Sequence, residues 1–213
     1  MDLRVNELFS SIQGESTYAG RPCTFVRLTG CNLRCSYCDT RYAFDEGRVM
    51  SVEDILLQVR ARGVPLVEVT GGEPLFQEAC PDLLRALVEE GYEVLVETNG
   101  SLPIGSLPTE AVCILDLKCP SSRMTDRMCW KNLERLRPRD EVKFVIQTRE
   151  DYLWARGHAG HLAKHGPDRL LFSPARGRMD PARLAAWILS DRIGVRLHLP
   201  LHPILWPDGP RGR

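Results

Sequence analysis

The chain has 213 residues, of which 28 are Lys or Arg and 28 are Asp or Glu, so its formal net charge is zero. This neutral balance gives no support to nucleic-acid binding as the main activity. No apolar run approaches the roughly 18 residues of a membrane span, and residues 1–7 carry no apolar signal core. We therefore expect a cytoplasmic protein without a membrane partner, folded as a single domain over residues 1–213.

Short apolar segments alternate with amphipathic segments along the chain. Apolar runs with a period of two predict strands, and apolar residues three and four apart predict helices. Ser51 and Asp54 mark the start of the first helix, and Gly63 marks its end. The predicted strands cover residues 3–9, 24–28, 66–70, 93–97, 112–117, 141–147, 169–173 and 194–199. One predicted helix begins after Ser51, and the others cover residues 81–90, 126–136, 151–164 and 181–190. Residues 10–16 are predicted to form a polar loop.

This alternation predicts βαβ units, and therefore an α/β fold with a mostly parallel sheet. About six such units are too few for a closed barrel of the eight-stranded type, so we expect a partial, open barrel. In parallel folds the chemistry lies at the carboxyl ends of the strands. The unusual motifs of this sequence all follow predicted strands: residues 31–38, 71–74, 97–100 and 116–118, Gln147, and residues 173–174.

Cys31, Cys35 and Cys38 lie within eight residues, directly after the predicted strand 24–28. A loop can direct three thiolates to one inorganic centre, whereas neighbouring strand residues point to opposite faces. Three thiolates are one ligand short of completing a 4Fe–4S cluster or a tetrahedral zinc site. The open position would bind another ligand. A structural zinc site with a distant fourth ligand is the alternative.

The chain contains eight cysteines, which is many for a cytoplasmic protein. In a reducing compartment, closely spaced cysteines bind metals more often than they form disulfides. We expect the five cysteines outside the loop to be small, buried apolar residues. A second cluster built from Cys113, Cys119 and Cys129 is the alternative for three of them.

The cysteine loop and Gly71-Gly72-Glu73-Pro74 after the next strand resemble the radical S-adenosylmethionine superfamily. The resemblance implies a 4Fe–4S cluster whose open iron binds S-adenosylmethionine, which the cluster cleaves to a 5′-deoxyadenosyl radical. The protein supplies placement and excludes water. Tyr37 matches the superfamily position near the adenine, and Gly72 would let backbone approach the cofactor closely.

A closer resemblance, over nearly the whole chain, is to the 7-carboxy-7-deazaguanine synthase family, which uses an abbreviated barrel. It rests on residues 9–16, Arg27, residues 38–40, 97–100, 118–121 and 143–145, and on Leu201, His202, Trp206, Arg211 and Gly212. The resemblance implies a carboxylated tetrahydropterin as substrate. Its ring contracts and loses ammonia after hydrogen is taken from C6. It also implies Mg2+, a homodimer, and an electron donor such as flavodoxin or ferredoxin.

The resemblance implies a role for each matching position. Arg27 would bind the substrate carboxylate, as a guanidinium does in bidentate pairs. Thr40 would offer its hydroxyl to Mg2+, a hard cation that prefers oxygen. The remaining substrate contacts would be Ile12, Gln13, Gly14, Glu15 and Thr70. The remaining cofactor contacts would be Tyr37, Cys38, Asp39, Gly72, Asp116, Leu117, Lys118 and Gln147.

Several of these residues also allow purely structural interpretations. Arg27 could be an ion-pair partner, Glu15 a turn cap and Lys118 a surface charge beside Asp116, while His202 could serve packing alone. The sequence Asp116-Leu117-Lys118 also departs from the small polar residues that the family more often has before the lysine.

Two other functions compete with this one. A radical activase that generates a glycyl radical on a partner protein shares the cysteine spacing and the compact size. A binding module that carries zinc or a cluster would be the non-enzymatic alternative. The loop around Gln13 and Arg27 favours a small acidic substrate over a protein partner, and a binding module has no need of Gly71–Pro74 at a strand end.

Overall fold

The computed structural model describes residues 1–165, 169–207 and 211, apart from the side chains of residues 164 and 165, and this part contains a nine-stranded sheet. Gly212, which contributed to the family resemblance, lies outside the described residues. The strands are β1 (Asp2–Ile12), β2 (Pro22–Leu28), β3 (Arg48–Ser51), β4 (Leu66–Gly71), β5 (Glu93–Thr98), β6 (Val112–Leu117), β7 (Glu141–Ile146), β8 (Leu170–Pro174) and β9 (Arg196–Leu197). The helices are α1 (Val52–Arg60), α2 (Cys80–Glu89), α3 (Arg149–His165), α4 (Pro181–Asp191) and α5 (His202–Leu205).

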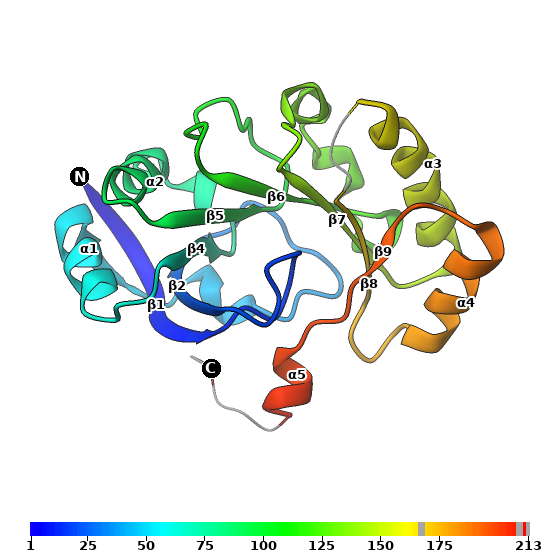
Figure 1. The fold of residues 1–213 in the computed structure, drawn as a ribbon, viewed down its shortest axis with the longest axis horizontal. Helices are drawn as coiled ribbons and strands as arrows, with labels where there is room; N and C mark the ends of the chain where they lie inside the picture. Colours follow the sequence, from blue (N-terminus) through cyan, green and yellow to red (C-terminus); the bar gives the residue numbers. More distant parts are fainter. Residues whose placement is uncertain (166–168, 208–210, 212–213) are drawn as a thin grey trace.

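The sheet has the order β3-β1-β2-β4-β5-β6-β7-β8-β9. All neighbours from β2 to β9 run parallel, whereas β1 pairs antiparallel with both β2 and β3. Figure 1 shows this curved sheet with α1 and α2 beside its first strands and α3 and α4 beside its last. The expected α/β fold with a partial, open barrel of parallel strands is confirmed.

The two faces of the sheet bury different sets of side chains. Val67, Val69 and Val96 lie on the outer face, where they belong to the main apolar core with Leu83 and Leu87 of α2, and all five are fully buried. The inner face carries a smaller apolar cluster: Cys23, Phe25, Leu66, Leu95, Val112 and Ile114. This small cluster forms a floor, because the residues further along the same strands on the inner face are polar.

The first helix begins as its sequence predicts. The Ser51 hydroxyl accepts a hydrogen bond from the Asp54 amide at 3.1 Å, and Asp54 Oδ2 accepts from the Ser51 amide at 3.4 Å. This reciprocal capping box satisfies two amides that a helix start leaves without partners. The predicted apolar side of α1, Ile55, Leu56 and Val59, is buried against the sheet.

Three local predictions were wrong, and one strand was not predicted. Strand β1 continues to Ile12, because Ile12 pairs with Pro22, so the predicted loop 10–16 begins later. Strand β3 was not predicted, and the last predicted strand shrinks to Arg196–Leu197. The predicted helix 126–136 is absent from the described chain. Short segments of 3₁₀ helix occupy this region instead, at Thr125–Arg127 and Trp130–Arg135.

The side chain of Asn132 explains the missing helix. Asn132 Oδ1 accepts from the Ile104 amide at 3.1 Å, and its Nδ2 donates to the carbonyls of Gly100 and Leu102 at 3.2 and 2.9 Å. Asn132 is only 1% exposed, so these bonds form out of water, where unpaired polar groups are costly. Tertiary hydrogen bonding of this kind overrides weak helical propensity.

No helix in the described part of the chain combines the length and apolar character needed to cross a bilayer.

Candidate active site

A cavity of about 930 Å³ opens at the carboxyl ends of the parallel strands. It is lined by the cysteine loop, by the loop after β1, by residues at the ends of β4 to β8, and by the segment from Leu199 to Pro207. Most predicted site residues meet here: Ile12, Gln13, Gly14, Glu15, Arg27, Cys31, Cys35, Tyr37, Cys38, Asp39, Thr40, Thr70, Gly72, Asp116 and Lys118 all line the cavity, as does His202.

Two predicted cofactor contacts do not line the cavity. Leu117 is 1% exposed and packs in the main apolar core, because the pleat turns it to the face opposite Asp116. Gln147 lies outside the lining as well. Its amide donates to Asp151 at 2.9 Å, and its Oε1 accepts from Arg178 at 3.4 Å. Any contact of Leu117 with a cofactor would have to come from its backbone.

The cysteine loop fits the ligand set of a cluster with an open iron. Cys31, Cys35 and Cys38 are half-buried free thiols on one cavity wall. Cys31 Sγ accepts from the Leu33 amide at 3.4 Å and lies 3.8 Å from Asn99 Nδ2, and such N–H donors stabilise cluster sulfur. In the part of the chain that is described, no three His, Cys, Asp or Glu groups surround a single ion. A cluster presents three separate irons, so its ligands stand further apart than the ligands of one zinc ion.

Gly72, directly after the end of β4, packs against the cysteine loop. A Cβ added at Gly72 would lie 2.4 Å from the Gly30 carbonyl oxygen and 2.7 Å from Cys31 Cβ, so no larger residue fits. The Glu73 amide donates to the same Gly30 carbonyl at 2.8 Å. The strand end at Gly72 is thus in direct contact with the loop that carries Cys31.

Glu73 connects this strand end to the next one. Its fully buried carboxylate accepts from Thr98 Oγ1 at 2.8 Å and from the amides of Leu75 and Asn99 at 3.0 and 2.6 Å. Burial raises the pKa of Glu73 to about 7, although these donors oppose the shift. Glu73 therefore fixes Asn99, whose side chain reaches Cys31.

Tyr37 places a phenol against the predicted cofactor position. Its hydroxyl is buried and forms no hydrogen bond within the described residues. Burial raises the pKa of the Tyr37 phenol well above its ordinary value. An unpaired buried hydroxyl is costly, so its position beside the cavity is consistent with a ligand partner.

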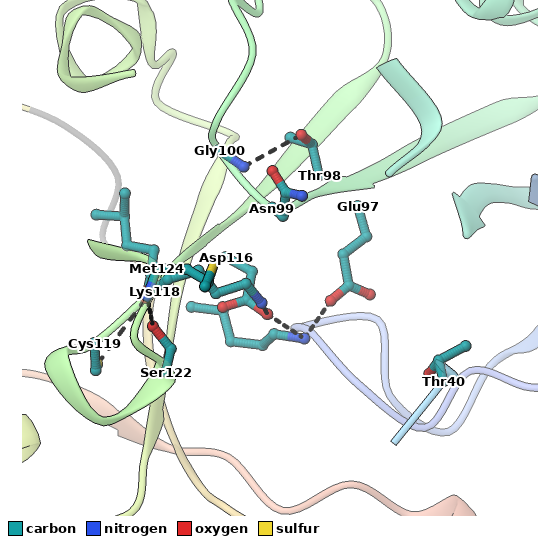
Figure 2. Close-up of polar contacts among 12 residues, drawn as sticks. Thr40, Glu97, Thr98, Asn99, Gly100, Asp116, Lys118, Cys119, Ser122 and Met124 are labelled. Carbon is teal, nitrogen blue, oxygen red and sulfur yellow. Dashed lines mark hydrogen bonds and ion pairs between the residues drawn. The ribbon is translucent and has the colours of Figure 1, made fainter. Parts of the chain in front are cut away.

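Charged side chains from β5, from β6 and the residue after it, from β7, and from the loop after β1 form a network beside the cysteine loop. Lys143 Nζ lies 2.8 Å from Glu15, is paired with Glu97, and lies 3.7 Å from Asp116. Lys118 Nζ lies 2.8 Å from Asp116 Oδ2. Figure 2 shows Glu97 and Asp116 directed toward a shared ammonium group, with Thr40 on the far side of Glu97.

Burial and proximity set the protonation of this network. Burial lowers the pKa of Lys143, but the carboxylates of Glu15, Glu97 and Asp116 outweigh it and hold that pKa well above its usual value. Burial raises the pKa of Glu15, but Lys143 and His198 together bring it down to about 2. Burial and the neighbouring carboxylates raise the pKa of Glu97. Lys143 and Glu15 are therefore fully charged near neutral pH.

Arg27 faces the cavity from β2. Its Nε atom donates to Glu7 Oε2 at 3.1 Å, and its guanidinium carbon lies 5.9 Å from the centre of the Tyr42 ring. Within the described residues, no other hydrogen bond reaches the guanidinium. Arg27 is thus both the ion-pair partner that the structural interpretation predicts and a cavity residue with terminal nitrogens available to a ligand.

The loop after β1 is held from the far end of the chain. The Leu201 amide donates to the Gly14 carbonyl at 2.9 Å, and the Ser16 amide donates to His198 Nε2 at 2.9 Å. Ser16 has φ of 63°, a left-handed conformation that costs energy outside glycine. Figure 1 shows the segment from Leu199 to Pro207, which contains α5, passing across the open side of the sheet. This segment therefore helps to shape the wall formed by Gly14 and Glu15.

Sequence reasoning did not single out Glu68 or His198. It also gave no individual role to Glu73 and Lys143, although both lie in motifs that carried the resemblance. A usable signal existed for two of them. Glu68 stands alone among Leu66, Val67 and Val69, and Lys143 lies in an equally apolar strand. An ionisable residue within a buried strand requires a partner or a function.

Four of the five cysteines outside the cysteine loop are buried, as expected for small apolar residues. Cys23, Cys80, Cys113 and Cys119 are fully buried, whereas Cys129 is half-buried. Burial raises the pKa of the Cys113 and Cys119 thiols well above the ordinary value, as expected for inert core residues.

Comparison with known proteins agrees with this geometry. Residues 25–113 match the family model described as the Radical SAM superfamily. The 7-carboxy-7-deazaguanine synthases of Koribacter versatilis and Chlorobaculum tepidum are 42% and 44% identical, each over 99% of this chain and over 100% and 97% of their own lengths. The crystal structure of QueE from Escherichia coli has a TM-score of 0.78 at 22% identity, covering 93% of this chain and 94% of its own, and supports the fold.

The partial barrel and its cysteine loop define a radical S-adenosylmethionine enzyme, which uses a 4Fe–4S cluster and S-adenosylmethionine. Such an enzyme acts on a small molecule and requires a reductant. The chain belongs to the 7-carboxy-7-deazaguanine synthase family.

Proposed function

We propose that the protein converts 6-carboxy-5,6,7,8-tetrahydropterin to 7-carboxy-7-deazaguanine and releases ammonia. The observation that supports this most directly is the position of Arg27 beside the cysteine loop, in one cavity at the ends of parallel strands. When bound, the cluster and S-adenosylmethionine supply the radical that takes hydrogen from C6 of the substrate. The chain binds, orients and shields that substrate.

Arg27 anchors the substrate carboxylate. Its terminal nitrogens can form the paired hydrogen bonds that a carboxylate accepts, while Glu7 fixes its Nε atom. Thr70 is the register partner of Arg27 on β4 and supplies a hydroxyl beside it. A carboxylated ring bound here would lie next to the cysteine loop, which begins four residues after Arg27.

The loop after β1 forms the substrate wall through Ile12, Gln13, Gly14 and Glu15. Glu15 is held by Lys143, and Gln13 is 2% exposed with its Oε1 accepting from the Glu15 amide at 3.0 Å. These groups are fixed before a ligand arrives, which lowers the entropy lost on binding. Residues between Leu199 and Pro207 line the cavity as well.

The cofactor contacts are assigned to the cysteine loop and the strand ends next to it. Cys31, Cys35 and Cys38 would hold the cluster, and Tyr37, Asp39, Gly72, Asp116 and Lys118 would contact S-adenosylmethionine. Leu117 would contribute through its backbone. Gln147 would act indirectly, by holding Arg178, which does line the cavity.

Thr40 is the proposed ligand for Mg2+. Its hydroxyl donates to Asp39 Oδ1 at 2.9 Å and faces the cavity, so its oxygen lone pairs remain available. Mg2+ takes few protein oxygens and completes its shell with water and substrate. The carboxylate held by Arg27 would be the substrate ligand in this arrangement.

We also propose that the chain folds as one domain over residues 1–213, works in the cytoplasm as a homodimer, and receives its electron from flavodoxin or ferredoxin. All eight cysteines are free, which suits a reducing compartment. The single domain follows from the chain length of 213 residues, and the homodimer and the electron donor follow from the family resemblance.

The proposal is tested with anaerobically reconstituted protein. Incubation with the carboxylated tetrahydropterin, S-adenosylmethionine, Mg2+ and a reductant should release equal amounts of ammonia and of a deazapurine that absorbs ultraviolet light. Tetrahydropterin without the carboxylate is the matched control and should give no product. Accumulation of 5′-deoxyadenosine without the deazapurine would show that the substrate is wrong.

A further inference from the structure

Glu68 is a carboxyl group in a place where the fold calls for an apolar side chain. It lies on the inner face of β4, between Phe25 of β2 and Leu95 of β5 in register, and is 3% exposed. Burying a carboxyl group costs several kcal/mol unless partners compensate. Its presence at the cavity floor therefore requires an explanation.

The partners of Glu68 compensate only in part. Its Oε2 accepts a hydrogen bond from Gln13 Nε2, and within the described residues it forms no salt bridge. Glu15 and Glu97, by contrast, are both paired with Lys143. Glu68 Oε1 forms no hydrogen bond in the described chain, yet it is not fully buried. This oxygen is therefore accessible from the cavity.

The position of Glu68 suits the far end of a bicyclic substrate. It lies two residues before Thr70 on the same face of β4, a rise of about 7 Å along the strand. Thr70 is level with Arg27 in the sheet. A ring system whose carboxylate is held at Arg27 would thus direct its opposite edge toward the cavity floor.

The opposite edge of a pterin is a 2-amino-4-oxopyrimidine, which offers two adjacent N–H donors, at N3 and at the 2-amino group. A carboxylate matches two adjacent donors with its two oxygens. We propose that Glu68 is the substrate-binding residue that accepts these two hydrogen bonds, held in place by Gln13. This inference rests on the proposed function, since it assumes the carboxylated pterin as substrate.

The charges around Glu68 make its binding sensitive to pH. Glu15 in the loop after β1, Glu97 on β5, Lys143 on β7 and the Cys23 thiol on β2 face it. Burial, Glu97 and Glu15 raise the pKa of Glu68 to about 8, against the opposing effects of Gln13 and Lys143. N–H donors from a ligand favour the ionised carboxyl group, so binding releases a proton below this pH. Affinity for the pterin should rise with pH up to about 8 and then level off.

The experiment compares two ligands on two proteins. The ligands are 6-carboxytetrahydropterin and its counterpart with a carbonyl oxygen in place of the 2-amino group. Dissociation constants are measured anaerobically with reconstituted enzyme loaded with S-adenosylmethionine, for the wild type and for Glu68→Gln. Glu78→Gln, at an exposed position, is the matched control.

In the wild type the 2-amino ligand should bind at least a hundredfold more tightly, because the 2-oxo ligand sets an acceptor against the carboxylate. In Glu68→Gln the amide can donate to the 2-oxo group, so this preference should fall at least tenfold. A purely structural role would weaken both ligands by one factor and leave the preference unchanged, which would overturn the proposal. An unchanged variant would overturn it as well.

Two further measurements keep the outcomes separate. If Glu68→Gln does not fold, the pH dependence of pterin binding by the wild type decides. An affinity that does not change between pH 6.5 and 8.5, on either side of the Glu68 pKa of about 8, overturns the proposal. If the wild type binds neither ligand and releases no ammonia, the proposed function itself fails, independently of Glu68.

Discussion

Lys143 on β7 and Glu15 in the loop after β1 form a partly buried ion pair of 2.8 Å across 128 residues of sequence. The same ammonium group pairs with Glu97 and approaches Asp116 at 3.7 Å. One cation therefore joins the substrate loop to two strand ends on the cofactor side. The carboxylates outnumber the ammonium groups in this network, so each ammonium group compensates a large part of the negative charge.

Replacement of Lys143 should destabilise the protein strongly. Lys143→Met would leave the buried Asp116 and the partly buried Glu15 and Glu97 with only Lys118 to balance them. Removing one partner of a buried pair costs about 3–5 kcal/mol. The free energy of unfolding, measured by chemical denaturation, should fall by that amount. Lys131→Met, at an exposed position, should change it little. A loss below about 1 kcal/mol would mean that water already screens the network.

A methyl group at Gly72 should displace the cysteine loop. The added Cβ would lie 2.4 Å from the Gly30 carbonyl and 2.7 Å from Cys31 Cβ, and both are backbone or rigid atoms. We expect Gly72→Ala to lower stability by about 1–3 kcal/mol and to reduce iron content after reconstitution by more than half. Gly157→Ala is the control, because nothing lies within 4 Å of its added Cβ. Full iron content in Gly72→Ala would contradict this contact.

The cysteine assignments predict a simple contrast. Cys35→Ser should lose the cluster absorbance and all turnover, because the loop then offers only two thiolates. Cys129→Ser should retain about four irons per chain, since this half-buried thiol lies outside the cavity lining. Iron analysis and electron paramagnetic resonance of the reduced protein measure both. Equal iron loss in the two variants would revive the second-cluster interpretation.

The strand ends of this protein could be predicted because local pattern determines them. Apolar runs ending in glycine or cysteine mark where β2 and β4 stop, and parallel strands bring those ends together. The segment 126–136 could not be predicted, because the three hydrogen bonds of Asn132 reach residues about thirty positions earlier. Local propensity carries no information about such partners.

The same limit applies within the site. The site residues assigned through the family resemblance line the cavity, apart from Leu117 and Gln147. Lys143 and Glu68 were visible as charges in apolar strands, yet nothing local indicates that their partners are Glu15 and Gln13. The alternation of side chains along a strand shows that Lys143 and Glu68 share a face with their neighbours, but it shows that this is the inner face only after the order of strands in the sheet is known.

Removal of the Thr40 hydroxyl should affect the metal and spare the cluster. Thr40→Ala keeps all three cysteines, so iron content should equal that of the wild type. The Mg2+ concentration for half-maximal activity should rise by about tenfold, as expected for the loss of one oxygen ligand. Thr40→Ser retains the hydroxyl and should behave like the wild type. An unchanged Mg2+ requirement in Thr40→Ala would exclude Thr40 as a ligand.

His198 should make stability depend on pH through the substrate loop. Its imidazole is 4% exposed and accepts from the Ser16 amide at 2.9 Å, which only the neutral form can do. Burial lowers the pKa of His198 from 6.5 to about 4 in the folded protein. The unfolded chain therefore binds the proton first as pH falls. The stabilisation is complete above pH 6.5 and is lost as pH falls from 6.5 toward 4.

The free energy of unfolding should therefore fall across this window, with a share on the order of 2–4 kcal/mol from His198 alone. His198→Gln offers an oxygen to the Ser16 amide and does not titrate, so its curve should be shallower than that of the wild type. His161→Gln, on the exposed side of α3, should leave the slope unchanged. Other acidic groups titrate in the same window, so the difference between curves carries the result. Parallel curves for His198→Gln and the wild type would show that Ser16 does not depend on a neutral imidazole.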